Sequence, residues 1–183
     1  MQIEKLLWSK AKTDVLKYLV FKRQGISMRA ISNDLQRSYP AIKKQIDHLI
    51  EAQILDVDKS QNSRSICIDE DISDLVVKLF TYSLQQDVYD FMKVYSACID
   101  KLFLGKVFGQ NAKHDLALIY KANTKELLDQ IKKNIDKEVF SNYFIDNVSM
   151  ISMSAKDFQT RYKLADKFVL DIISKWKKQD IID

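Results

Sequence analysis

One short stretch of the chain combines small, hydroxyl-bearing and cationic side chains: Ser38, Tyr39, Ala41, Lys43 and Lys44. Lysines neutralise phosphates, and small or hydrogen-bonding side chains approach base edges in a major groove. If these five residues share the exposed face of a helix, that face has the chemistry to bind duplex DNA. The apolar residues between them must then hold the opposite face of the helix in a core.

The apolar spacing predicts two consecutive helices around this stretch. Ser27 is a candidate N-cap for a short helix with Met28, Ile31 and Leu35 on one side. Ser38 is a candidate N-cap for a second, longer helix, because Pro40 suits a first helical turn. The apolar stripe of that second helix consists of Ile42, Ile46, Leu49 and Ile50.

Elements on either side complete a small domain. A helix is predicted from Ser9 to about residue 21, with Gly25 as a left-handed cap at its end. After the two central helices, residues 54–59 and 64–69 alternate apolar and polar side chains around a polar turn. We expect a β-hairpin there, with Lys59 and Arg64 beside its tip.

Helix, helix, turn, longer helix and a basic-tipped hairpin occur in that order over about residues 9–69, and this segment resembles the winged helix-turn-helix domain of archaeal and bacterial transcription regulators. The resemblance implies that the helix after Ser38 is a recognition helix for double-stranded DNA. The residues expected at DNA on this interpretation are Arg29, Arg37, Ser38, Tyr39, Ala41, Lys43, Lys44, Lys59 and Arg64.

Charge and composition agree with a DNA-binding protein of the cytoplasm. The chain has 183 residues and a net charge of +4, and residues 1–68 hold 12 basic against 7 acidic side chains. We expect no transmembrane helix, no signal peptide and therefore a cytoplasmic location, because apolar runs are short and the N-terminus lacks a leader pattern. Cys67 and Cys98 are expected to be free, buried thiols, with a disulfide or metal site as the less frequent alternative.

The fold class predicted for the whole chain is α+β. The winged helix would occupy residues 1–70, a connecting helix residues 71–85, and a small α/β domain residues 86–183. For the last part we predict a helix over 86–99, strands near 101–109, 114–121 and 145–153, and a helix over 125–137 capped by Thr124. A long closing helix begins after Ser154 and bends near Ala165.

Residues 86–176 are similar to the minimal nucleotidyltransferase-like fold, because a strand ending in glycine is followed by a strand with the sequence His-Asp-Leu-Ala-Leu-Ile. In that fold a Gly-Ser turn and a pair of aspartates hold phosphate and divalent metal. Here Gly105 matches, but Lys106 replaces the serine, and Lys113 and Asp115 stand at the two carboxylate positions. One carboxylate cannot hold Mg²⁺ alone, so we expect no catalytic residues, no metal and no cofactor, and a degenerate nucleotide site at most.

Three functions follow as hypotheses. The first is a homodimeric, sequence-specific transcription regulator whose C-terminal domain dimerises or senses a small-molecule or nucleotide effector. The second is a nucleotidyltransferase-type enzyme or nucleotide-binding protein that docks through its winged helix, and the third is a protein-docking module. His48 and His114 lack partners at metal-ligand spacing. Aromatic residues of the second half, Phe103 among them, could line a small-molecule pocket, although core positions are the more frequent role.

Overall fold

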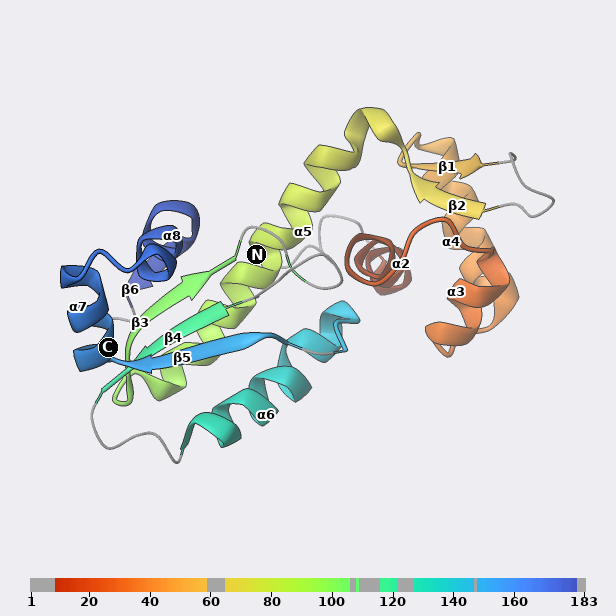
Figure 1. Cartoon of the computed structure of the whole chain (residues 1–183). Coiled ribbons are helices and arrows are strands. Elements are labelled where there is room, and N and C mark those ends of the chain that lie inside the picture. The colour runs from red at the N-terminus through yellow and green to blue at the C-terminus, as the bar shows by residue number, and fades with distance from the viewer. Residues whose placement is uncertain are drawn as a thin grey trace. The chain divides into compact units, whose positions relative to one another are not determined.

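Figure 1 presents the computed structural model, which describes residues 9–58, 65–105, 108, 116–121, 127–146 and 148–180. The fold class is α+β, as predicted, with seven α-helices and two small sheets in the described residues. The chain divides into two compact units, residues 1–83 and residues 84–183. This division falls inside the segment 71–85 for which a connecting helix was predicted.

The first unit contains the elements predicted for residues 9–69 in the predicted order. Three helices, α2 (Lys10–Phe21), α3 (Met28–Asp34) and α4 (Tyr39–Glu51), precede strands β1 (Leu55–Asp58) and β2 (Ser65–Ile68). The two strands pair antiparallel, with Leu55 opposite Ile68 and Val57 opposite Ile66. The hairpin prediction is therefore confirmed for its strands. The turn between them and the flanking Lys59 and Arg64 lie outside the described residues.

Every element of the first unit contributes to one apolar core. Its fully buried side chains come from all three helices and from both strands. They include Val15, Leu16, Leu19, Ile31, Ile42, Ile46, Leu49, Leu55 and Ile66. Burial at helical spacing on α4 and at alternate positions of the hairpin is what the sequence periodicity predicted.

Gly25 has the predicted left-handed backbone but a different role. Its φ is +69°, while α2 already ends at Phe21. The N–H of Gly25 donates to the carbonyl of Ile66, and Ile26 forms an isolated antiparallel bridge with the same Ile66. The glycine therefore turns the chain so that Ile26 pairs with β2, and it does not cap the helix. Sequence spacing did not reveal this long-range pairing.

Helix α5 (Glu70–Met92) corrects the prediction of two separate helices. Residues 83–86 contain neither glycine nor proline, so nothing in the local sequence interrupts the hydrogen-bonding pattern. Leu84 and Gln85 are buried, and the Gln85 side-chain amide donates to the carbonyl of Gly105 at 3.0 Å. Leu75 of this helix, although apolar, is 69% exposed. A short 3₁₀ turn, η1 (Lys93–Tyr95), follows α5.

The second unit is built on a mixed sheet of four strands in the order β5-β4-β3-β6. Strands β3 (Ile99–Leu104) and β4 (Leu116–Tyr120) pair antiparallel, and β5 (Met150–Ser154) pairs parallel with β4. The three predicted strands are confirmed in shortened form, although Ile99 belongs to β3 and not to a helix. Strand β6 (Lys177–Asp180), antiparallel to β3, was not predicted. Its four polar residues give no apolar signal in the sequence.

Helices cover this sheet (Figure 1). Helix α6 (Leu128–Glu138) buries Leu128, Ile131 and Ile135 as predicted, but Leu127 is 40% exposed, and Thr124 lies outside the described residues. A 3₁₀ turn, η3 (Phe140–Tyr143), follows α6. Helices α7 (Ala155–Lys163) and α8 (Lys167–Lys175) pack on the face of the sheet that carries Phe103, Ala117, Ile119 and Met153.

Two further expectations concern the membrane and the cysteines. Among the helices of the described ranges, none has the combined length and apolar content that crossing a bilayer requires. Neither Cys67 nor Cys98 is in a disulfide among the described residues, and each is half-buried where full burial was predicted. Both cysteines lie beside buried strand residues without being fully enclosed by them.

The predicted interruption of the closing helix is confirmed at Ala165, which has φ +53° between α7 and α8. The left-handed conformation costs an L-residue about 1–2 kcal/mol, whereas glycine adopts it freely at an unfolded-state entropy cost of about 0.4–1 kcal/mol. We expect Ala165→Gly to raise the free energy of unfolding by about 0.5–1 kcal/mol and Ala165→Val to lower it. Urea denaturation measures both changes, and equal stabilities for the two variants would contradict the strain argument.

Candidate nucleic-acid interface

The orientation of α4 is fixed by its apolar side. Ile42 and Ile46 are 0% exposed and Leu49 is 2% exposed. Because helical residues three and four apart share a face, these three define the buried side of the helix; Lys43 and Lys44 point outward, whereas Gln45 flanks the buried side and is partly buried. Tyr39 is 42% exposed, and the remaining predicted DNA-facing residues of the helix, Ala41, Lys43 and Lys44, are exposed as well.

Lys43 and Lys44 form no ion pair with any described residue. Both side chains are exposed on the outside of the domain, where an external partner can reach them. His48 is exposed one turn beyond Lys44. Asp47 is the only acidic residue between Tyr39 and Ile50, so the N-terminal half of the helix is positive.

The N-terminus of α4 adds backbone donors to this face. Ser38 occupies the N-cap position with extended backbone, but its hydroxyl makes no capping hydrogen bond, contrary to the predicted capping role. The first backbone N–H groups of a helix have no partner inside it and carry the positive end of the helix dipole. Exposed Ser38, Tyr39 and Ala41 surround this end. Such an end is suited to an anionic oxygen.

The turn that joins α3 to α4 is held by local hydrogen bonds. Gln36 takes the left-handed conformation with φ +51°. The hydroxyl of Ser32, itself buried, donates to the carbonyl of Arg37 at 2.7 Å, and the Arg37 N–H donates to the Ser32 carbonyl at 3.1 Å. The Tyr18 hydroxyl donates to the Asp34 carboxylate at 2.6 Å. These contacts fix the angle at which α4 leaves α3.

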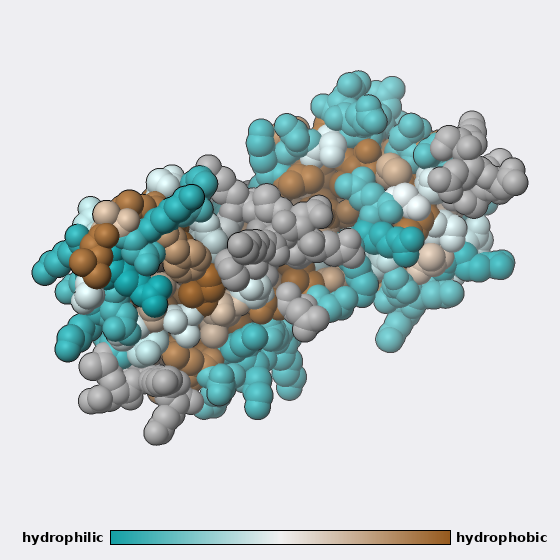
Figure 2. Space-filling model, viewed as in Figure 1, coloured by the Kyte–Doolittle hydropathy of each residue, from teal (hydrophilic) through white to brown (hydrophobic). Residues whose placement is uncertain are grey.

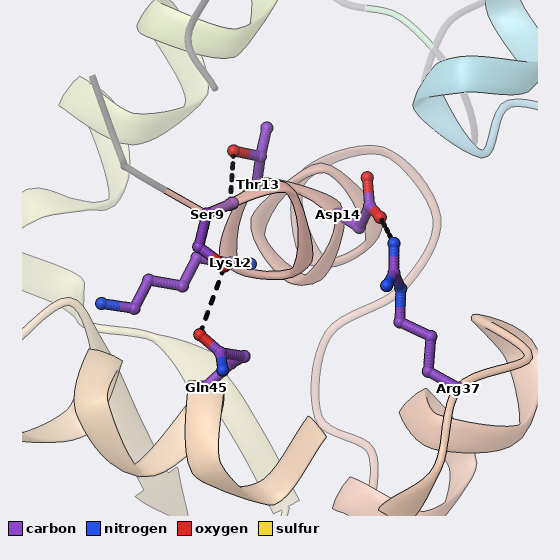
Figure 3. Close-up of polar contacts among 6 residues, drawn as sticks. All are labelled: Ser9, Lys12, Thr13, Asp14, Arg37 and Gln45. Carbon is purple, nitrogen blue, oxygen red and sulfur yellow. Dashed lines mark hydrogen bonds and ion pairs between the residues drawn. The ribbon is translucent and has the colours of Figure 1, made fainter. Parts of the chain in front are cut away.

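Two side-chain contacts tie α2 to the α4 segment (Figure 3). The Ser9 hydroxyl donates to Gln45 Oε1 at 3.4 Å, and Arg37 forms an ion pair with Asp14 at 2.6 Å. Ser9 also caps α2 by accepting from the Lys12 N–H. Arg37 is expected at the DNA backbone from its charge, but in the structure its guanidinium pairs with Asp14, and 36% of the side chain is exposed. The Arg37 side chain therefore helps to hold the start of α4 against α2.

The described part of the hairpin contributes little positive charge. Asp56 and Asp58 of β1 are exposed, and Asp56 accepts from the N–H of Val57. Carboxylates repel phosphates, so these strands cannot lie along a DNA backbone on their acidic side. Any contact of the hairpin with DNA depends on its tip, where Lys59 and Arg64 fall outside the described residues. Arg29, exposed on α3, is a further cation of this unit.

The degenerate nucleotide site predicted in the second unit is represented by Gly105 alone. Gly105 is buried at the end of β3, and its carbonyl accepts a hydrogen bond from Gln85. Lys106, Lys113 and Asp115 lie outside the described residues. Sequence alone does not predict Gln85 as a partner of Gly105, because a glutamine within a helix gives no signal of a long-range contact.

Perturbed titratable groups do not form a catalytic pair in the described part of the chain. Burial raises the pKa of the Asp136 carboxyl, and Lys132 one turn earlier partly offsets this. Its Oδ1 atom has no hydrogen-bond partner among the described residues. A hydrogen bond to Asp90 raises the pKa of Lys93, an exposed residue. The described residues contain no group of three His, Cys, Asp or Glu side chains that could hold a metal.

Comparison of the chain with protein-family models, with curated proteins and with solved structures finds no match. The function is therefore inferred from the geometry of the molecule itself. Of that geometry, the exposed positive face of α4 is the feature with the most defined chemistry.

The packing of α4 leads to a stability prediction. Ile46→Ala removes a fully buried side chain from the face that orients the helix, and we expect a loss of about 2–5 kcal/mol in the free energy of unfolding. Lys44→Ala, two residues away on the exposed face, should change it by less than about 0.5 kcal/mol. Urea denaturation of both variants provides the comparison. Similar losses for the two would mean that Lys44 and Ile46 do not occupy opposite faces.

Proposed function

We propose that this protein is a sequence-specific, DNA-binding transcription regulator of the winged helix-turn-helix type, in which α4 is the recognition helix. The observation that carries the proposal is the division of α4 into a fully buried apolar face and an exposed face with Tyr39, Ala41, Lys43 and Lys44. Lysines would contact phosphates, and Tyr39 and Ala41 would approach base edges.

The order of the surrounding elements supports the same function. Helix α2, the Ile26 bridge, helices α3 and α4, and the β1–β2 hairpin follow one another as in a winged helix, with the bridge pairing onto the second hairpin strand. A helix must project from its support to enter a major groove, which is about 12 Å wide. The Asp14–Arg37 ion pair and the Ser9–Gln45 hydrogen bond hold α4 against α2 from its inner side. Its outer side remains available for DNA.

We further propose that the regulator acts as a homodimer. One recognition helix contacts only a few base pairs, and specific regulators of this kind pair two copies on half-sites about one helical turn apart. The second unit, residues 84–183, is the part of the chain that the DNA-contacting elements do not use. It would supply the dimer contacts or respond to an effector.

The first test reverses the charge of the proposed DNA face. We expect Lys43→Glu together with Lys44→Glu to weaken binding to a duplex by about tenfold or more near 0.1 M salt. The slope of log affinity against log salt should fall by about two, because each lysine would release one counterion equivalent. Fluorescence anisotropy with labelled duplex at several salt concentrations measures both quantities.

Lys78→Glu is the matched control for this test. Lys78 is an exposed lysine of the first unit, on α5 and outside the proposed interface. Its reversal changes the net charge by the same amount per residue but should leave the salt slope unchanged. Equal effects at Lys78 and at the α4 lysines would indicate general electrostatics and refute α4 as the recognition helix.

The second test asks what sequence is bound and with what symmetry. Selection from a random duplex pool should enrich an inverted repeat with half-sites about ten base pairs apart. Enrichment of a single unsymmetrical site would refute the homodimer but would agree with α4 as the recognition helix. Failure to enrich or retain any duplex at low salt would refute DNA binding and favour a protein-docking role for the same face.

A further inference from the structure

A small cavity lies in the second unit, on the side of the sheet covered by α7 and α8. Its volume is about 230 Å³, and it is lined by Lys101, Phe103, Phe158, Tyr162, Ile173 and Lys178. An apolar cavity of about 150 Å³ is large enough to bind benzene. The present cavity therefore has room for one six-membered ring and a short substituent.

The wall of the cavity is aromatic and aliphatic. Phe103 of β3 and Phe158 of α7 are in ring contact, with centroids 5.7 Å apart, and both belong to the core between sheet and helices. Tyr162 and Ile173 close the sides and are 54% and 40% exposed. Figure 2 shows apolar surface among hydrophilic side chains over α7 and α8. Exposed apolar side chains beside a hollow can gain free energy by covering an apolar ligand.

Two lysines stand at the same hollow on neighbouring strands. Lys178 of β6 pairs with Phe103 of β3, and Lys101 lies two residues before Phe103, so all three side chains belong to one face of the sheet. Lys101 and Lys178 are thus diagonal neighbours, a separation that long side chains can bridge. Because both lysines line the same cavity, their side chains can reach one anionic group bound there.

Lys101 has an ion pair at present, with Asp100 at 2.7 Å. Both partners are about one-third exposed (32% and 34%), and ion pairs of this exposure contribute little to stability. The register of β3 against β4 also shifts between Ile99 and Lys101, so Asp100 sits at an irregular position of the strand. An incoming carboxylate can therefore compete for the Lys101 ammonium group without opening the core.

We propose that this cavity binds a small aromatic carboxylate, with the ring against Phe103, Phe158 and Ile173 and the carboxylate between Lys101 and Lys178. The cavity volume fits a single ring, and the apolar side chains of its wall can pack against that ring. The two lysines can each bind one oxygen of a carboxylate. This site is independent of the proposed DNA interface, because all six lining residues belong to the unit formed by residues 84–183.

The test uses 3-phenylpropionate as the probe and the full chain as the protein. Methyl NMR follows Ile173, because an aromatic ring packed against this residue shifts its methyl resonance by ring current. We expect a saturable shift at Ile173 with 3-phenylpropionate and binding at least about threefold weaker with neutral 3-phenylpropanamide. No saturable shift at Ile173, or equal affinity for acid and amide, would overturn the proposal.

Two variants test whether the ammonium groups of Lys101 and Lys178 bind the carboxylate of the probe. Lys101→Met and Lys178→Met should each raise the dissociation constant of 3-phenylpropionate by about threefold or more, since methionine keeps the side-chain length and removes the ammonium group. Lys167→Met, an exposed lysine of α8 that does not line the cavity, should leave it unchanged. Unchanged binding in both cavity variants, or an equal effect at Lys167, would refute the site. If either cavity variant unfolds, the acid and amide comparison on the natural chain still decides.

Discussion

The burial of Ile42, Ile46 and Leu49 is the constraint on which the proposed function depends. These side chains have almost no exposed surface, and rotating α4 about its axis would bring them into water at a cost of about 1.5–3 kcal/mol for each. The rotation of the helix is therefore fixed, and so is the face that carries Lys43 and Lys44. The hydrophobic core thus determines which way the polar side chains of α4 face, even though none of the core residues would touch a ligand.

Polar contacts further restrict the position of α4, which is set mainly by the burial of its apolar face. The Asp14–Arg37 ion pair, the Ser32–Arg37 hydrogen bonds and the Ser9–Gln45 contact all lie at the N-terminal side of α4 or on its inner flank. Partly exposed ion pairs contribute modest free energy, so their role is to restrict the geometry more than to stabilise the fold. For Arg37 this contact competes with the role at DNA that its charge alone suggests.

The two units use their charge differently. In the first, cations of α4 are exposed without described ionic partners, while acidic residues occupy the exposed side of the hairpin strands. In the second, Lys101 and Lys178 gather at an apolar hollow on one face of a sheet. An exposed positive helix face would suit an extended polyanion, whereas a cation pair over an apolar wall would suit a small anion with an apolar body. The chain therefore contains two surfaces suited to different classes of ligand.

The sequence by itself determined the helices and strands of residues 9–69, the buried stripe of α4, strands β3, β4 and β5 of the second sheet and the break at Ala165. These features are set by local periodicity and by single residues with special backbone preferences. Only the tertiary structure decided that residues 70–92 form one helix, that Gly25 serves the Ile26–Ile66 bridge, that Arg37 pairs with Asp14 and that β6 joins the sheet. The contacts of Gly25, Arg37 and β6 each depend on a partner distant in sequence, which leaves no periodic signal along the chain, whereas the continuous α5 has no glycine or proline to interrupt it.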